Sequence, residues 1–125
     1  MQKWEIVEGS LASAQGFRGA AIAAGIKKTR GELDLALILC DAPATTAAGL
    51  FTTNLVLAAP VLLSQQNLAE SHGRCRAVLV NSGNANACTG RKGMHTARES
   101  ARAAAKLLSL QPAQVIGRAS CRERV

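Results

Sequence analysis

An abrupt change from a short apolar run to a polar loop constrains this fold more than any other feature of the sequence. Residues 77–80 are Ala-Val-Leu-Val, a brief and partly β-branched run that is typical of a buried strand. The next ten residues, NSGNANACTG at 81–90, include three asparagines, two glycines, a serine and a threonine. Asn and Gly tolerate left-handed backbone angles, and short amide side chains hydrogen-bond the nearby backbone. The pattern therefore predicts a tight loop at a strand end.

This loop has two interpretations, a plain surface turn and a ligand-binding loop. An ordinary turn needs one or two such residues, whereas this loop offers several amide donors and acceptors just beyond a strand, where open α/β sheets bind ligands. The sequence favours neither role for the loop side chains: they could contact a substrate or only brace the ends of the sheet. The candidate substrate-side residues are Asn81, Ser82, Gly83, Asn84, Asn86 and Thr89.

The clearest helix pattern follows the loop, over residues 94–108. Apolar residues recur there at spacings of three and four, with charged residues largely between them. The apolar face is mostly alanine, so this helix can lie close to a sheet, and Gln111-Pro112 limits its extent. The apolar positions are Met94, Ala97, Ala101, Ala104, Ala105 and Leu108.

Apolar runs elsewhere predict the remaining strands. Residues 34–40 form a near-continuous apolar run that fits a strand buried on both faces, and residues 47–53 fit a second strand paired beside it as a hairpin. Residues 60–63 are a third candidate, with Pro60 at the first position, and residues 4–7 could form a short strand. Ser64 is the expected N-cap of a short helix over residues 65–70, which residues 71–73 end.

Residues 16–28 fit two structures. Their alanines favour a helix, but Gly16, Gly19 and Gly25 each cost about 1 kcal/mol in a helix interior, so extended structure competes. Taken together, the segments predict a mixed α/β (α+β) fold. It has a sheet of about four to six strands packed with one long alanine-rich helix.

Composition limits the class of protein. The chain has 125 residues, is 48% hydrophobic and carries a formal charge of +7, which fits one globular domain. Its basic residues are dispersed, and only 2% of the chain is aromatic, so base-stacking platforms are lacking. A small basic nucleic-acid-binding module is therefore the less favoured alternative, and we expect no nucleic-acid partner.

Cysteine spacing and hydropathy argue against a metal site and a membrane span. The four cysteines form no CxxC pair and have no histidine at ligand spacing, so we expect reduced thiols and no metal. Residues 1–10 lack the apolar core of a secretory signal, and no apolar stretch reaches the roughly 18 residues of a membrane helix. We therefore expect a cytoplasmic protein without a membrane partner. The cysteines are Cys40, Cys75, Cys88 and Cys121.

No common catalytic motif occurs in the sequence. His72 and His95 flank the polar loop, and Cys88 with His95 could be considered as a nucleophile and base. No acidic residue is suggested to orient that histidine, so exposed histidines are the preferred interpretation.

Five ordered blocks resemble the ornithine acetyltransferase family of arginine biosynthesis, the bifunctional glutamate N-acetyltransferases. The similarity runs in register from about Gly16 to Val115. The blocks are GFR at 16–18 with AGIK at 24–27, DLALI at 34–38, AAGLFTTN at 47–54, AAPV at 58–61 and NSGNANACTG at 81–90.

The resemblance implies a layered αββα fold related to N-terminal-nucleophile-type acyltransferases. In that family a threonine, freed at a new N-terminus by self-cleavage of the precursor, attacks N-acetylornithine, and the acetyl group then passes to glutamate. Bifunctional members also accept acetyl-CoA, no cofactor stays bound, and two α and two β chains form a heterotetramer. A related amidohydrolase, which would transfer the acyl group to water, is the alternative within this class.

The end of the chain departs from the family pattern. The family's alanine-rich helix and Pro-containing turn lead into a strand that closes with Ser-Thr-Gly-Val-Ile-Gly, whose Thr and Gly form the oxyanion hole, and the nucleophilic threonine comes later. Neither is present here, so no catalytic residue is assigned and the isolated chain is expected to be inactive. Residues 116–125 resemble a reading frame through a short-read sequencing adapter. We therefore expect residues 1–115 to be the truncated N-terminal part of such an enzyme, and 116–125 to be a non-native tail.

Overall fold

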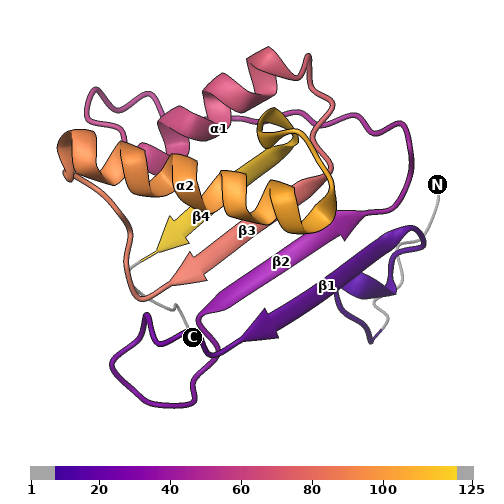
Figure 1. Ribbon diagram of the computed structural model, residues 1–125, viewed down its shortest axis with the longest axis horizontal. Helices are drawn as coiled ribbons and strands as arrows, with labels where there is room; N and C mark the ends of the chain where they lie inside the picture. The colour runs from indigo at the N-terminus through magenta and orange to yellow at the C-terminus, as the bar shows by residue number, and fades with distance from the viewer. Residues whose placement is uncertain (1–7, 121–125) are drawn as a thin grey trace, which may run out of the picture.

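The computed structural model describes residues 8–120, which form one four-stranded sheet with two α-helices on one of its faces (Figure 1). This arrangement confirms the mixed α+β class and the strand number expected from the sequence. The strands are β1 (Phe17–Ile22), β2 (Leu35–Cys40), β3 (Ala77–Ser82) and β4 (Val115–Ser120). The helices are α1 (Ala59–Glu70) and α2 (Gly90–Leu108), with short 3-10 turns η1 (Leu11–Ser13) and η2 (Pro112–Gln114).

The strands lie in sequence order, and only the last pair is parallel. β1 and β2 are antiparallel with Phe17 opposite Cys40, and β2 is antiparallel to β3. Parallel strands need a crossover connection, which α2 provides between β3 and β4. In that pair Ala77 lies opposite Val115 and Ser82 opposite Ser120, so β3 and β4 end at the same edge of the sheet.

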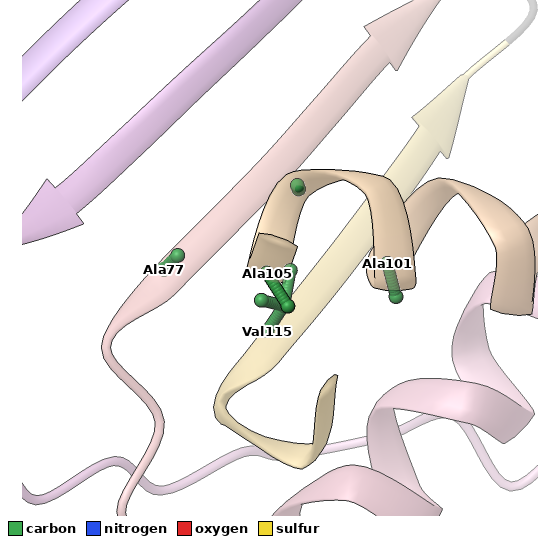
Figure 2. Packing of buried hydrophobic residues seen from close by; sticks show 5 residues of the cluster. Ala77, Ala101, Ala105 and Val115 are labelled. Atoms are coloured by element: carbon green, nitrogen blue, oxygen red, sulfur yellow. The ribbon is translucent and has the colours of Figure 1, made fainter. Parts of the chain in front are cut away.

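The core lies between α2 and the β3–β4 pair. Figure 2 shows Val115 of β4 beside Ala105 of α2, and both side chains are only 1% exposed. Because alanine side chains are small, the helix can approach the strands closely, as the sequence predicted. The buried cluster is Ala77, Ala101, Ala104, Ala105 and Val115, surrounded by partly buried leucines from both helices and the sheet.

Three segments confirm the expectations drawn from periodicity. The strands expected at 34–40 and 77–80 are β2 and β3, and the helix expected at 94–108 is α2, which begins four residues earlier at Gly90. For residues 16–28, the extended alternative is the correct one, because β1 occupies residues 17–22. α1 ends at Glu70 with Ser71 as its C-cap, as the polar residues 71–73 predicted. The strand suggested at residues 4–7 lies outside the described residues.

The prediction of a strand at residues 47–53 is wrong. β2 already has β1 on one side and β3 on the other, so no edge remains for residues 47–53 to pair with it. The segment instead runs irregularly along the surface, where Leu50 is fully exposed. The expectation that β2 is buried on both faces is also wrong, because all six of its residues are half-buried.

The prediction of a strand at residues 60–63 is wrong as well. These residues form the first turns of α1, where Pro60 fits because the first N–H groups of a helix have no partner within it. Ser64 therefore lies inside the helix and is not its N-cap. Its hydroxyl instead accepts a hydrogen bond from Gly117 N–H (3.1 Å) and donates one to the Gly117 carbonyl (2.9 Å).

Candidate functional site

Residues 81–90, here called the amide loop, leave the end of β3 and enter α2. Four residues of the loop have positive φ angles: Gly83 (100°), Asn86 (49°), Cys88 (57°) and Gly90 (57°). The left-handed region is sterically costly for most residues, but glycine and asparagine adopt it readily. Gly83, Asn86 and Gly90 therefore suit the backbone path of the loop, whereas Cys88 adopts a positive φ although it is neither glycine nor asparagine.

The side chains of Asn81 and Asn84 set the shape of the first half of the amide loop. The Asn81 Nδ2 donates a hydrogen bond to the Asn84 carbonyl (2.8 Å), and Asn86 N–H donates one to Asn84 Oδ1 (2.9 Å). Each of these two asparagines uses one amide atom in this way. In the structure of residues 8–120, Asn81 Oδ1 and Asn84 Nδ2 have no hydrogen-bond partner.

Asn86 has a different role, because both of its amide atoms bind the start of α2. Its Nδ2 donates to the Gly93 carbonyl (2.9 Å), and its Oδ1 accepts from the Thr89 hydroxyl (2.6 Å). Its backbone carbonyl accepts a hydrogen bond from Ala59 N–H (3.3 Å), at the first residue of α1. Asn86 thus joins the loop to both helices, which is the bracing role considered for this loop.

Gly93 is part of this brace although it contributes no side chain. A Cβ atom at Gly93 would overlap the Thr89 hydroxyl and Asn86 Oδ1. The first turn of α2 therefore has glycine at this position to leave room for the Asn86–Thr89 pair.

A cavity of about 540 Å³ lies between the sheet and the two helices, and the amide loop forms its polar rim. Asn81, Asn84, Asn86 and Thr89 line the rim together with Lys92 of α2. The inner wall is apolar, with leucines from β2, β3 and α1. The structure thus brings four of the six candidate residues together at one opening. With Arg118 of β4, which also lines the cavity, the site presents amide groups and two cations to a small polar ligand.

The other two candidates, Ser82 and Gly83, do not line this cavity. Ser82 N–H donates to the Asp34 carbonyl (2.9 Å), which extends the β2–β3 pairing. Gly83 packs against Lys27, where a Cβ atom on the glycine would lie 3.0 Å from Lys27 Cγ. These two residues fix where the loop begins.

Asp34 is a residue of this region that the sequence analysis missed. It is only 4% exposed, and its carboxylate accepts hydrogen bonds from the N–H groups of Ala24 (2.6 Å), Ile26 (2.6 Å) and Lys27 (2.9 Å). The bond from Lys27 N–H, with those from Ala24 and Ile26, lowers the pKa of the Asp34 carboxyl because they stabilise its charged form. The one sequence signal for it is an acidic residue directly before an apolar strand.

None of the histidines and cysteines of residues 8–120 lines the cavity, and Cys121 lies outside the described residues. His72, Cys88 and His95 are all exposed. Within residues 8–120, no group of three His, Cys, Asp or Glu side chains could hold a metal ion. The same part of the chain includes no helix with the length and apolar character needed to cross a membrane.

We predict that Gly93→Ala destabilises the protein by about 1–2 kcal/mol, because overpacking an occupied site costs about 1–3 kcal/mol. Helix propensity alone predicts the opposite, since alanine is about 1 kcal/mol better than glycine in a helix interior. Urea unfolding measures the difference. Adding Thr89→Ala should recover part of the loss, and a stabilised Gly93→Ala protein would contradict the role given to Asn86 and Thr89.

Comparison with known proteins gives consistent matches. The sequence model of the ArgJ family matches residues 18–120. The chain is 52% identical over 104 residues to the arginine biosynthesis bifunctional protein ArgJ of Geobacter sulfurreducens, covering 83% of this chain and 25% of that protein. It is 48% identical over 98 residues to ArgJ of Shouchella clausii, covering 78% and 23%. The chain thus spans about a quarter of the length of these relatives.

Two crystal structures have the same fold. One is the arginine biosynthesis bifunctional protein ArgJ of Bacillus halodurans, with a TM-score of 0.81 and 37% identity, covering 90% of this chain and 56% of that one. The other is the ornithine acetyltransferase of Mycobacterium tuberculosis complexed with ornithine, with a TM-score of 0.82 and 44% identity, covering 91% and 61%. The sheet with two helices on one face therefore agrees with the layered fold expected from the sequence.

Proposed function

This chain belongs to the ArgJ family, and from that premise we propose that it forms part of an acetyltransferase of arginine biosynthesis. The proposed reaction transfers an acetyl group from N-acetylornithine to glutamate. The segment contributes a sheet, two helices and one wall of the substrate site. The nucleophilic threonine and the oxyanion-hole Thr-Gly pair belong to the family's later sequence, so this segment alone is proposed to be inactive.

One observation carries this proposal: the amide loop lies where the parallel strands β3 and β4 both end. By the family resemblance, the strand after the alanine-rich helix closes with the Ser-Thr-Gly segment of the oxyanion hole. In this fold the strand after that helix is β4, the direct neighbour of β3. The amide loop is therefore expected beside the oxyanion hole of the complete enzyme, at the edge of a sheet where α/β proteins bind ligands.

Within the loop, we assign substrate contact to Asn81 and Asn84 and bracing to Asn86. The acetamido group of N-acetylornithine has one carbonyl acceptor and one N–H donor. Asn84 Nδ2 and Asn81 Oδ1, the atoms that the loop itself does not use within residues 8–120, are a matching donor and acceptor on the cavity rim. Both amide atoms of Asn86 are already occupied.

The complete enzyme is further proposed to cleave itself, to assemble as a heterotetramer of two α and two β chains, and to act in the cytoplasm without a bound cofactor. Acetyl-CoA is the proposed second acetyl donor. The family resemblance supports these statements.

Residues 116–125 are proposed to be non-native, with native sequence ending at Val115. The family match reaches residue 120, and residues 116–120 complete β4. Strand pairing uses backbone atoms, so a wide range of sequences can form this ladder. Residues 116–119 of β4 all line the cavity, so the proposed boundary falls within its wall.

Sequencing the locus from intact DNA tests this boundary. We expect a residue other than glycine at position 117, because glycine weakens a strand interior. Finding the codons for residues 116–125 in the genome would refute the proposal.

Assay of the complete gene product tests the function. We expect transfer of labelled acetyl from N-acetylornithine to glutamate, with ornithine as the other product, and no transfer by the 125-residue chain. Acetate release without any glutamate acetylation would support the amidohydrolase alternative and contradict the proposed reaction.

Asn84→Asp in the complete enzyme tests the assignment of the amide loop. Aspartate keeps the acceptor for Asn86 N–H but removes the donor proposed for the substrate carbonyl. Loss of one hydrogen bond of about 1.4 kcal/mol raises the KM for N-acetylornithine about tenfold. Asn54→Asp, an exposed asparagine on the irregular segment, is the matched control for the added charge. An unchanged KM with lowered stability would instead give Asn84 a bracing role only.

A further inference from the structure

The connection between β1 and β2 folds around one side chain, the carboxylate of Asp34. Three backbone N–H groups, of Ala24, Ile26 and Lys27, donate to its two oxygens over 2.6–2.9 Å. Burial of a carboxylate is unfavourable unless such donors replace water, and charge-assisted bonds of this kind are short and strong. The side chain therefore fixes the backbone of residues 24–27 as a turn, here called the Asp34 turn.

The Asp34 turn is joined directly to the start of the amide loop. The Asp34 carbonyl accepts a hydrogen bond from Ser82 N–H (2.9 Å), the last residue of β3. The next residue, Gly83, lies against Lys27, and a Cβ atom there would be only 3.3 Å from Lys27 N and Cα. The Lys27 backbone thus lies close to Gly83, so a shift of the turn toward the loop would displace Gly83.

The two segments also share one cavity. Ile26 of the Asp34 turn lines the 540 Å³ cavity together with Asn81 and Asn84 of the amide loop. The Asp34 carboxylate itself does not line it, because its oxygens face the three N–H donors. Its position suits a residue that acts through its neighbours.

We propose that Asp34 is a positioning residue of the substrate site: by holding the Asp34 turn against Gly83, it fixes the rim formed by Asn81 and Asn84. This inference rests on the proposed function for the identity of the substrate. The mechanical coupling between the turn and the loop is independent of it.

Asp34→Asn in the complete enzyme tests the proposal. Asparagine has the same shape, but its NH2 group faces backbone N–H groups in place of one oxygen, so the turn loses part of its hydrogen bonding. We expect amide hydrogen exchange to quicken at least tenfold in residues 24–27 and also in residues 82–86. We also expect the KM for N-acetylornithine to rise at least fivefold, with kcat changed less than twofold, because the rim is displaced while the reacting groups remain in place.

Asp41→Asn is the matched control. Asp41 follows the opposite end of β2, is exposed, and pairs with Arg18 at 2.7 Å. Its substitution removes one carboxylate beside the same strand without touching the Asp34 turn. We expect neither the exchange rates of residues 82–86 nor the KM to change in this variant.

Two outcomes would overturn the proposal. Faster exchange in residues 24–27 with unchanged exchange in residues 82–86 would show that the turn and the loop are not coupled. A fall in kcat at constant KM would show that Asp34 does not act through the substrate rim. A complete enzyme that exchanges amides as expected but transfers no acetyl group would refute the proposed function and leave the coupling intact.

Discussion

Close packing of the alanine face of α2 on the β3–β4 pair is the interaction on which the rest of the structure depends. Ala105 and Val115 meet with no side chain between them, so the helix lies close to the strands it connects (Figure 2). β3 ends at Ser82 and α2 begins at Gly90, so only the seven residues 83–89 connect the two elements. The positive φ angles of the amide loop are the consequence of this short path.

The asparagines of the amide loop have two different roles, which depend on where each lies between β3 and α2. Asn86 lies where it can reach both the first turn of α2 and the start of α1, and both of its amide atoms are used there. Within residues 8–120, Asn81 and Asn84 each use only one amide atom in a hydrogen bond. Different asparagines can therefore brace the loop and, as we propose, contact the substrate. The Asp34 turn supports this loop from the β1–β2 side of the sheet.

Local sequence patterns predicted those helices, strands and loops whose structure depends on their own residues. The alanine spacing of α2 and the apolar runs of β2 and β3 were sufficient, as was the turn chemistry of the amide loop. Strand assignments at 47–53 and 60–63 failed because apolar character alone does not say whether a sheet edge is available. Pro60 fits the first position of either a strand or a helix, so it could not decide between them. Resemblance to known sequences, not periodicity, identified the family.

Asp34 could not be found from spacing, because its three donors are backbone groups that carry no sequence signal. The division of work among Asn81, Asn84 and Asn86 was equally hidden, since it depends on which amide atoms the fold leaves unused. A crystal structure of the complete enzyme with N-acetylornithine bound is the most direct measurement. The account predicts the acetamido group within hydrogen-bond distance of Asn81 or Asn84, with Asn86 still bound to Gly93 and Thr89. A substrate held elsewhere, with no contact to the amide loop, would contradict it.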